Sequence, residues 1–293
     1  MRTLIIIICF FIILSCDSKK IERYENGNIK KEYSLQKDKI EGFYKEYYEN
    51  GNIKEIHKYR DGARVDSSFY YYKTADRRIK RIKYNYIEDT LQIKDYAVNG
   101  VLIREGSMLQ NENKIGKWFL YREDGTLSEV LEYIDLDGKE YLNQGWHFDK
   151  KEDTIPNKGN YLKFKFSKDT VHLYEPIKVL VKLQQPLLSY NSEVYICIPK
   201  GSFDEVNDNF SNLREIEWDT LPSIKNEKII ENYNKYNLYV SFGLEFNKPG
   251  IKHIRGFLSE NNEISLNKQK KDSINMKERK IYFDEIIYVK DKK

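Results

Sequence analysis

Few residues of this chain have the types and spacing that catalysis or metal binding requires. The four histidines, at 57, 147, 172 and 253, lie far apart in the sequence, whereas zinc ligands usually come in closely spaced pairs. Cys197 lies in an apolar run and is expected to be a buried packing residue, because a reactive thiol needs exposure and basic neighbours. Nucleophile elbows, phosphate-binding loops and dinucleotide glycine patterns do not occur. The sequence therefore predicts no catalytic residue, no cofactor and no metal site, although the fold could still bring two carboxylates together.

Aromatic residues are the strongest candidates for binding. They make up 14% of the chain, which contains 24 tyrosines. Tyr47, Tyr71 and Trp118 are the candidate binding residues, because rings that are not packed can stack on sugars or anchor a protein partner. The alternative is that these rings are structural, since tyrosine favours strands.

The charge balance argues against a nucleic-acid partner. Lys and Arg number 50 and Asp and Glu number 46, which gives a net charge of +4. A nucleic-acid-binding protein concentrates positive charge on one face. The mixed charges of this chain do not favour that class.

A repeat of 24 to 25 residues must position most of these rings. The segment Tyr24–Lys30 recurs unchanged at Tyr48–Lys54. Weaker copies begin at Tyr72, Tyr96 and Tyr121. Asn-Gly or Asp-Gly between strand-like runs favours a two-residue type I′ hairpin turn. Because one hairpin is only marginally stable, we expect five stacked hairpin repeats over residues 24–148.

The repeat resembles the variant MORN repeat of the YwqK-type antitoxin family. Members read Tyr-x-Asn/Asp-Gly-x-aliphatic and then glycine followed by an aromatic residue. Gly42-Phe43 and Gly116-Lys117-Trp118 carry that second signature, whereas the copy at Tyr72 lacks both glycines. The resemblance implies an elongated sheet of hairpins, and it leaves open whether a toxin is captured.

A second domain is expected after the repeats. Residues 149–160 are polar and contain Pro156 and Gly159, which is typical of a linker. Residues 161–293 contain six to eight short strand-like runs, which predict a β-sandwich. Lys248-Pro249-Gly250 before a strand resembles Ig-like modules of exported proteins. Residues 201–236 are expected to form a long loop or an insertion with a short helix, and long loops often bind ligands. The fold class is therefore all-β, with stacked hairpin repeats followed by an Ig-like β-sandwich.

The N-terminus predicts export. Arg2 is followed by 11 apolar residues, Leu4–Leu14, a run too short to span a bilayer but suited to a signal peptide over residues 1–15. The segment Ile13-Leu14-Ser15-Cys16 resembles the lipobox of bacterial lipoproteins. This resemblance implies a lipid on Cys16. We further expect a tether over residues 16–23 and anchoring to the cell envelope of a Gram-negative bacterium, in its outer membrane.

One further pattern concerns hydroxyl residues. Aspartate precedes Ser or Thr and a large aliphatic residue at five places, with the hydroxyls on Thr90, Thr154, Thr170, Thr220 and Ser273. This pattern resembles the O-glycosylation acceptor of some Gram-negative bacteria. The alternative is local, because aspartate caps turns that precede strands.

These observations favour a non-catalytic lipoprotein that binds or scaffolds through its repeat sheet. Its expected contacts are the membrane, through the lipid, and a protein or glycan partner. An immunity protein that captures a toxin is one alternative. A glycan-binding or hydrolytic envelope protein is another.

Overall fold

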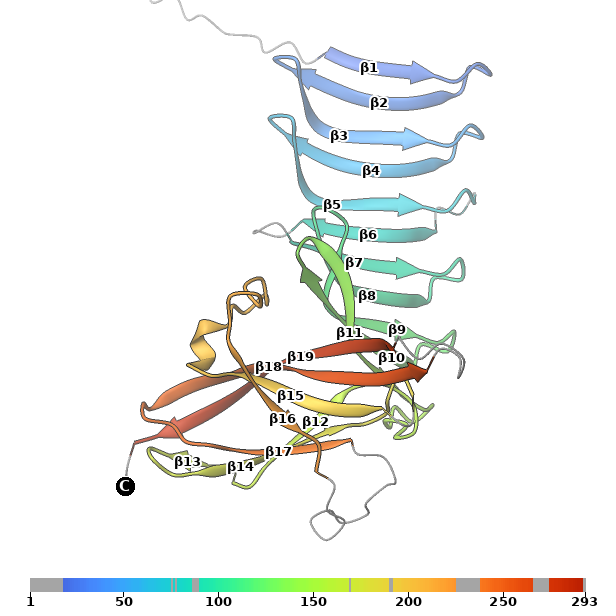
Figure 1. Cartoon of the computed structure of the whole chain (residues 1–293). Coiled ribbons are helices and arrows are strands. Elements are labelled where there is room, and N and C mark those ends of the chain that lie inside the picture. Colours follow the sequence, from blue (N-terminus) through green and yellow to red (C-terminus); the bar gives the residue numbers. More distant parts are fainter. Residues whose placement is uncertain are drawn as a thin grey trace, which may run out of the picture. The chain divides into compact units, whose positions relative to one another are not determined.

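The computed structural model describes residues 18–74, 76, 78–85, 90–168, 170–189, 192–224, 238–265 and 274–291. Over these residues the predicted all-β class is confirmed, with three sheets and one short 3₁₀ helix, η1 (Phe203–Glu205) (Figure 1). No helix in this part of the chain is long and apolar enough to cross a membrane. The predicted signal peptide, Cys16 and Ser273 lie outside the described residues. The chain forms two compact units, residues 1–103 and 104–293.

The first unit contains strands that follow one another as antiparallel hairpins. They are β1 (Ser18–Arg23), β2 (Ile29–Gln36), β3 (Lys39–Tyr47), β4 (Ile53–Arg60), β5 (Ala63–Tyr71), β6 (Ile79–Asn85) and β7 (Thr90–Tyr96). Every residue of β1 is exposed, and β1 pairs with β2 from Ser18 onward. The tether expected over residues 16–23 is therefore a strand from Ser18 to Arg23.

The hairpins use two kinds of turn, and the prediction of type I′ for the Asn-Gly turns was wrong. Between β1 and β2 the Gly27 N–H donates to Tyr24 O at 3.0 Å and the Tyr24 N–H donates to Asn28 O at 2.9 Å. Only Gly27 in this turn has a positive φ, of 85°, whereas type I′ needs two such residues. Three residues, 25 to 27, therefore connect the two strands. Residues 24 to 27 form a type I turn, and Gly27 supplies the left-handed bulge that follows it. The Asn50-Gly51 turn repeats these bonds.

The two-residue turn occurs at the opposite ends of the strands. Asp61 and Gly62, which join β4 to β5, have φ values of 51° and 81°, and Arg60 pairs with Ala63. Lys37 and Asp38 take the same conformation between β2 and β3. The two turn types therefore alternate from β1 to β5.

The repeated tyrosine ties each hairpin to the next. The hydroxyls of Tyr24, Tyr48 and Tyr72 donate to the backbone oxygens of Tyr47, Tyr71 and Tyr96, each at 2.8 Å. The side-chain amides of Asn26 and Asn28 both donate to Glu49 O. The motif residues are therefore structural links between hairpins.

The structure shifts the alignment of the last two copies by one residue. Gly100 donates to Ala97 O and Gly125 donates to Arg122 O, so Ala97 and Arg122 are equivalent to Tyr24. Tyr96 and Tyr121 each precede their turn. The Arg122 guanidinium takes over the tyrosine's role, because it donates to the backbone oxygens of Phe148 and Asp149.

The glycine of the Gly-aromatic signature forms a bulge in its strand. Gly42 (φ 78°) lies where the β2–β3 register shifts, and Asp66 (φ 65°) lies at the equivalent shift between β4 and β5. Gly116 (φ 63°) lies at the shift between β8 and β9. A left-handed residue recurs at this point even where glycine is replaced by aspartate, which tolerates that conformation.

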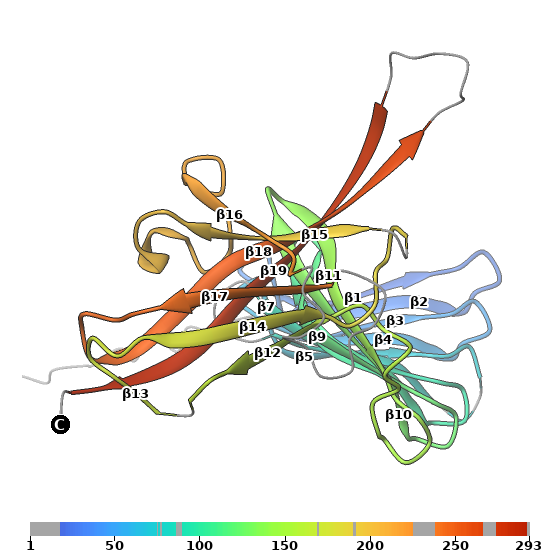
Figure 2. The ribbon, with the colours of Figure 1, turned by 60° about the horizontal axis from the view of Figure 1, so that its bottom comes forward.

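The second unit contains the last repeats and two further sheets (Figure 2). The last repeats are β8 (Leu102–Leu109), which begins at the unit boundary, β9 (Lys114–Tyr121), β10 (Leu127–Leu136) and β11 (Lys139–His147), and these strands follow one another as antiparallel hairpins. The three-stranded sheet consists of β12 (Leu162–Phe166), β14 (Ile177–Leu183) and β17 (Tyr239–Leu244). The five-stranded sheet consists of β13 (Val171–His172), β19 (Ile274–Lys290), β18 (Gly250–Ser265), β15 (Glu193–Pro199) and β16 (Trp218–Pro222).

Residues from both smaller sheets form one hydrophobic core. Buried and outward residues alternate along β14, so one face of this strand packs inward. Val181 of β14, Val240 of β17, and Ile196 and Leu258 of the five-stranded sheet are fully buried in the same cluster. The two sheets thus pack as a sandwich. The likeness to Ig-like modules stays a prediction.

The boundary expected at residues 149–160 differs from the observed one. The compact units divide between Ile103 and Arg104. Residues of the expected linker fold back on β11, since Phe148 bridges to Thr154 and Gly145 bridges to Asn160. Asp149 begins another turn of the repeat type, with its N–H donating to Asp153 O at 2.9 Å.

Candidate binding surfaces

Five rings form a continuous row across the repeat sheet of the first unit, which we call the ring ladder. It consists of Tyr33 on β2, Tyr44 on β3, His57 and Tyr59 on β4, and Tyr70 on β5. The strand register places Tyr44 opposite His57. Neighbouring ring centroids lie 5.5 to 6.5 Å apart, so each ring fixes its neighbours.

Charged groups flank the ring ladder. Glu46 and Glu55 lie directly opposite each other on β3 and β4. Glu46 accepts from Lys54 at 2.5 Å and from the Tyr44 hydroxyl at 3.2 Å. Arg64 donates to the Tyr59 hydroxyl at 2.9 Å, and its guanidinium lies 5.8 Å from the centre of that ring. The ladder therefore presents fixed hydroxyls and charges of both signs.

His57 is the buried centre of the ladder. Its side chain is 1% exposed, and neither ring nitrogen has a hydrogen-bond partner among the described residues. Nε2 lies 3.4 Å from Glu55 Oε2, and this contact lowers the pKa of Glu55. Burial raises the pKa of Tyr44 and of Tyr70, so both hydroxyls stay neutral at physiological pH.

The three rings singled out from the sequence do not belong to the ladder. Trp118 is 2% exposed, its Nε1 donates to Ser107 O at 2.8 Å, and its ring lies against Gly106. The prediction that Trp118 binds a ligand is therefore wrong, because the indole is used in packing. Tyr47 and Tyr71 are half-buried, and the Tyr47 hydroxyl donates to Glu32 at 2.8 Å. This bond lowers the pKa of Glu32.

The ladder was missed because it depends on strand register. A search for paired aromatic residues finds Tyr47 and Tyr71, which adjoin the repeated tyrosine. The bulges at Gly42 and Asp66 change which residues lie opposite each other. Reading those two left-handed positions as bulges would have placed Tyr33 beside Tyr44 and Tyr70 beside His57.

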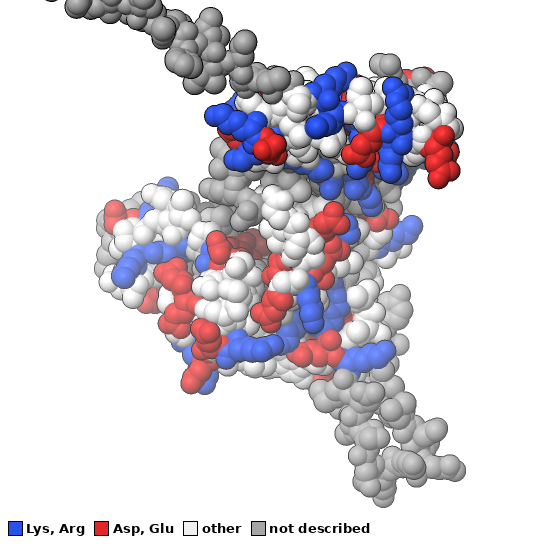
Figure 3. All heavy atoms as spheres, turned by 90° about the horizontal axis from the view of Figure 1, so that it is seen from above, with Lys and Arg blue, Asp and Glu red and all other residues white. Residues whose placement is uncertain are grey.

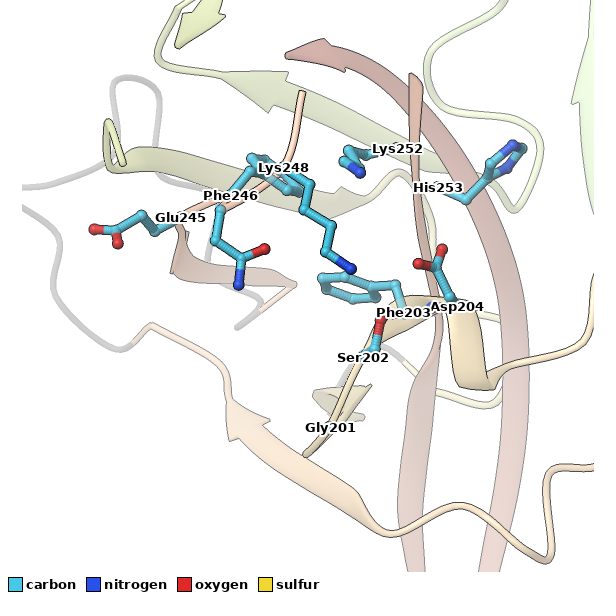
Figure 4. Close-up of a pocket in the computed structure, with 10 residues that line it drawn as sticks. Gly201, Ser202, Phe203, Asp204, Glu245, Phe246, Lys248, Lys252 and His253 are labelled. Atoms are coloured by element: carbon cyan, nitrogen blue, oxygen red, sulfur yellow. Dashed lines mark hydrogen bonds between the residues drawn. The ribbon is translucent and has the colours of Figure 1, made fainter. Parts of the chain in front are cut away.

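A polar pocket of about 500 Å³ lies in the second unit (Figure 4). Lys248 extends toward Phe203, and His253 lies on β18. His253 Nδ1 lies 2.7 Å from Asp284 Oδ1, a pairing that could orient a general base. Ser202, however, is engaged in capping η1, where its Oγ accepts from the Asp204 N–H. The pocket does not assemble a nucleophile with its base.

The other histidines also lie beside carboxylates. His147 lies 3.4 Å from Glu129, and His172 lies 3.2 Å from Glu175. Among the described residues, no group of three or more His, Cys, Asp or Glu side chains could hold a metal ion. Cys197 is a buried thiol, and burial raises its pKa. It is packed as expected.

The four predicted glycosylation sites that lie within the described residues differ in accessibility. Thr154, Thr170 and Thr220 are exposed, whereas Thr90 is half-buried at the start of β7. Thr220 lies on β16, with its hydroxyl 3.8 Å from Cys197 Sγ. Three of the four described threonines could therefore be reached by an enzyme.

Charge is mixed on the face shown in Figure 3, where basic and acidic side chains alternate. No protein-family model matches this sequence, and no curated protein or solved structure matches it either. The resemblances to the variant MORN repeat and to bacterial lipoproteins therefore stay predictions from the sequence.

Proposed function

We propose that this chain is a non-catalytic, lipid-anchored binding module of the cell envelope, and that the ring ladder is its recognition surface for a protein partner. The observation that carries the proposal is the ladder itself, five rings held in place by one another and by Arg64, Glu46 and Glu55. Tyr and Arg are the residues that most often dominate protein interfaces. A surface already fixed in place loses less conformational entropy on binding.

The sheet around the ladder supports this proposal. Among the described residues of the first unit, only His57, Ser68, Ile82, Ile93 and Asp95 are buried. Both sheet faces in this unit therefore carry partly accessible side chains. The strand register places four of these five residues, all except Ile82, on the ladder face. The ladder tyrosines themselves are only half-buried, so a partner can reach part of each ring.

The same geometry favours a protein over a glycan. Sugars stack on the open face of a ring, but in the ladder Tyr33, Tyr44 and His57 stack on one another at 5.8 Å. The ladder face also carries the charges of Glu46, Glu55 and Arg64, which suit hydrogen bonds to a polar protein surface. A toxin is one such partner.

The proposal is tested by photo-crosslinking in the native host. A photoreactive amino acid replaces Arg64, beside the ladder, in one strain. In the control strain it replaces Lys58, which alternates with the ladder residues His57 and Tyr59 along β4 and therefore points to the opposite face. We expect one major crosslinked protein from position 64 and not from position 58. The same products from both positions, or none from position 64, would contradict the proposal.

The anchor is tested separately. The Cys16→Ala variant should leave the membrane fraction, because the thioether-linked lipid requires the thiol. Mass spectrometry of the native N-terminus should show an acylated Cys16. A native chain without lipid, or a Cys16→Ala variant that stays fully membrane-bound, would refute the anchor without affecting the ladder.

A further inference from the structure

A groove in the second unit lies between the last repeats and the 208–211 turn. Its larger hollow measures about 630 Å³ and has apolar walls, formed by Leu109, Ile115, Tyr133, Ile134 and Phe210. A second hollow of about 260 Å³ also contacts Glu132, Ile134 and Phe210. Because the two hollows share these residues, they adjoin and form one elongated groove.

The groove is preformed by internal contacts. Phe210 has a φ of 56° and is 7% exposed, with its ring 5.3 Å from that of Tyr282. Asn212 closes the turn, because its amide donates to Glu205 O and its Oδ1 accepts from the Asn207 N–H. On the opposite wall, Gly116 forms the bulge of β9. No rearrangement is needed to open the site.

The larger hollow of the groove has a strongly acidic lining, whereas the smaller one includes Lys117 together with Glu132, Asp284 and Glu285. The larger hollow is lined by Glu132, Asp135, Asp137 and Asp208, and its lining contains no Lys, Arg or His. This excess of negative charge stands out in a chain whose net charge is +4. Apolar walls with carboxylates at the rim complement a ligand that combines an apolar body with a cation.

Neutral groups hold two of these carboxylates in place. Glu132 accepts from the amides of Asn143 and Gln144 at 2.7 and 2.9 Å. Asp135 accepts from the Asn113 amide at 2.9 Å and from the Gly138 N–H at 2.7 Å. These bonds fix the oxygens in place, and none of the four donors is a cationic side chain.

The exposed pair Asp137 and Asp208 is accessible to a ligand cation. Asp137 lies 3.5 Å from Arg214, but both side chains are exposed, and such surface ion pairs contribute little. A ligand cation can therefore compete for Asp137.

We infer that this groove binds a short segment of a partner protein that carries Lys or Arg beside large apolar residues. The apolar side chains would lie on Ile134 and Phe210, and the cations would face Asp137 and Asp208. Two adjoining hollows suit an extended segment better than a compact amine. The inference is independent of the ring ladder, which is a different surface of the chain.

The test uses the mature full-length chain and the capped peptide acetyl-Leu-Arg-Phe-Arg-amide, with binding measured by calorimetry. The double variant Asp137→Asn/Asp208→Asn removes two rim charges. Its matched control is Asp38→Asn/Asp61→Asn, which changes the net charge equally. Asp38, Asp61 and Asp137 all have positive φ in two-residue turns, a conformation that asparagine accepts.

We expect the Kd of the basic peptide to rise about 5-fold in the groove variant and less than about 2-fold in the control, as exposed charge pairs allow. Ile115→Thr should also weaken binding, because it shortens an apolar wall while keeping a β-branched residue in β9. Two control peptides should bind more weakly, acetyl-Leu-Glu-Phe-Glu-amide for charge and acetyl-Gly-Arg-Gly-Arg-amide for apolar contact.

Four results would overturn the inference. They are the absence of saturable binding up to about 1 mM, equal weakening by the two double variants, equal affinity for the acidic peptide, and benzylamine binding as tightly as the basic peptide. The last would indicate a small-amine site instead. Crosslinking from position 64 does not depend on these variants, so failure here is distinguishable from failure of the proposed recognition surface.

Discussion

Asn143 and Tyr282 exchange two hydrogen bonds and thereby join the last repeat strand to the sandwich. Asn143 Nδ2 donates to Tyr282 O at 2.9 Å, and the Tyr282 N–H donates to Asn143 Oδ1 at 2.8 Å. The side-chain amide thus does what a neighbouring strand's backbone does in a sheet. Tyr141 and Arg279 reinforce the contact with bonds to backbone oxygens of Lys280 and Asn143. β11 therefore meets β19 through specific bonds as well as apolar packing.

Asn143→Ala should destabilise the second unit by about 2–4 kcal/mol, because it leaves a buried N–H and C=O of Tyr282 without partners. Urea unfolding followed by tryptophan fluorescence measures this loss. Asn247→Ala is the matched control, since Asn247 is exposed, and it should change stability by no more than about 0.5 kcal/mol. Equal losses in the two variants would contradict the role assigned to Asn143.

Tyr48→Phe should weaken the first unit by about 0.5–1.5 kcal/mol, the usual contribution of one hydrogen bond. The variant removes only the hydroxyl that donates to Tyr71 O and keeps the ring. Tyr33→Phe is the control, because Tyr33 contributes ring stacking on Tyr44, which phenylalanine retains. Thermal unfolding of both variants should separate them. A Tyr33→Phe loss as large as that of Tyr48→Phe would show that the inter-repeat bond has no special role.

The repeat could be predicted from the sequence because its signal is local. Asn26-Gly27 and Asn50-Gly51 mark turns by themselves, and alternation marks strands. The type of turn could not be read, since it depends on whether two or three residues close the hairpin. The one-residue shift in the alignment of the last copy was hidden in the sequence. Arg122 stands where the earlier copies have the linking tyrosine, and it donates to the equivalent backbone oxygens of the next repeat.

The binding surfaces were less predictable because they depend on residues distant in sequence. The ladder needs the register set by bulges at Gly42 and Asp66. The groove needs Phe210 placed beside Ile134, more than seventy residues away. Trp118 stood out by residue type, yet its environment makes it a core residue.

Gly106→Ala should destabilise the second unit by about 1–3 kcal/mol, the usual cost of overpacking. A Cβ at Gly106 would meet Trp118 Cδ2 at 2.4 Å, with the rest of the indole behind it. Gly243→Ala is the control, because its nearest contact would be 3.8 Å away. Differential scanning calorimetry compares the two. If Gly106→Ala left the stability unchanged, the close contact between Gly106 and the Trp118 indole would be contradicted.

Alkaline pH should destabilise the second unit through Tyr121. Burial, together with the hydrogen bond to Glu105 at 2.7 Å, raises the pKa of Tyr121 to about 12. Since the folded pKa lies above the ordinary value of 10.0, this contribution is complete below pH 10 and is lost as pH rises from about 10 to 12. Tyr121→Phe should flatten the decline in stability over that range, whereas Tyr288→Phe, at an exposed position, should not. Identical pH profiles for all three proteins would contradict this assignment.

The exposed Asp-Thr-aliphatic sites should carry glycan in the native host. Thr154, Thr170 and Thr220 are exposed, so a transferase can reach their hydroxyls, whereas Thr90 at the start of β7 is half-buried. The intact mass of the native protein should therefore exceed the mass of the lipidated chain without glycan. The triple variant Thr154→Ala/Thr170→Ala/Thr220→Ala should lose most of that excess mass. Thr126→Ala is the matched control, because Thr126 follows Gly125 in a turn and lacks the preceding aspartate. A native mass equal to that of the bare lipidated chain would leave the aspartates with their local role of capping turns before strands.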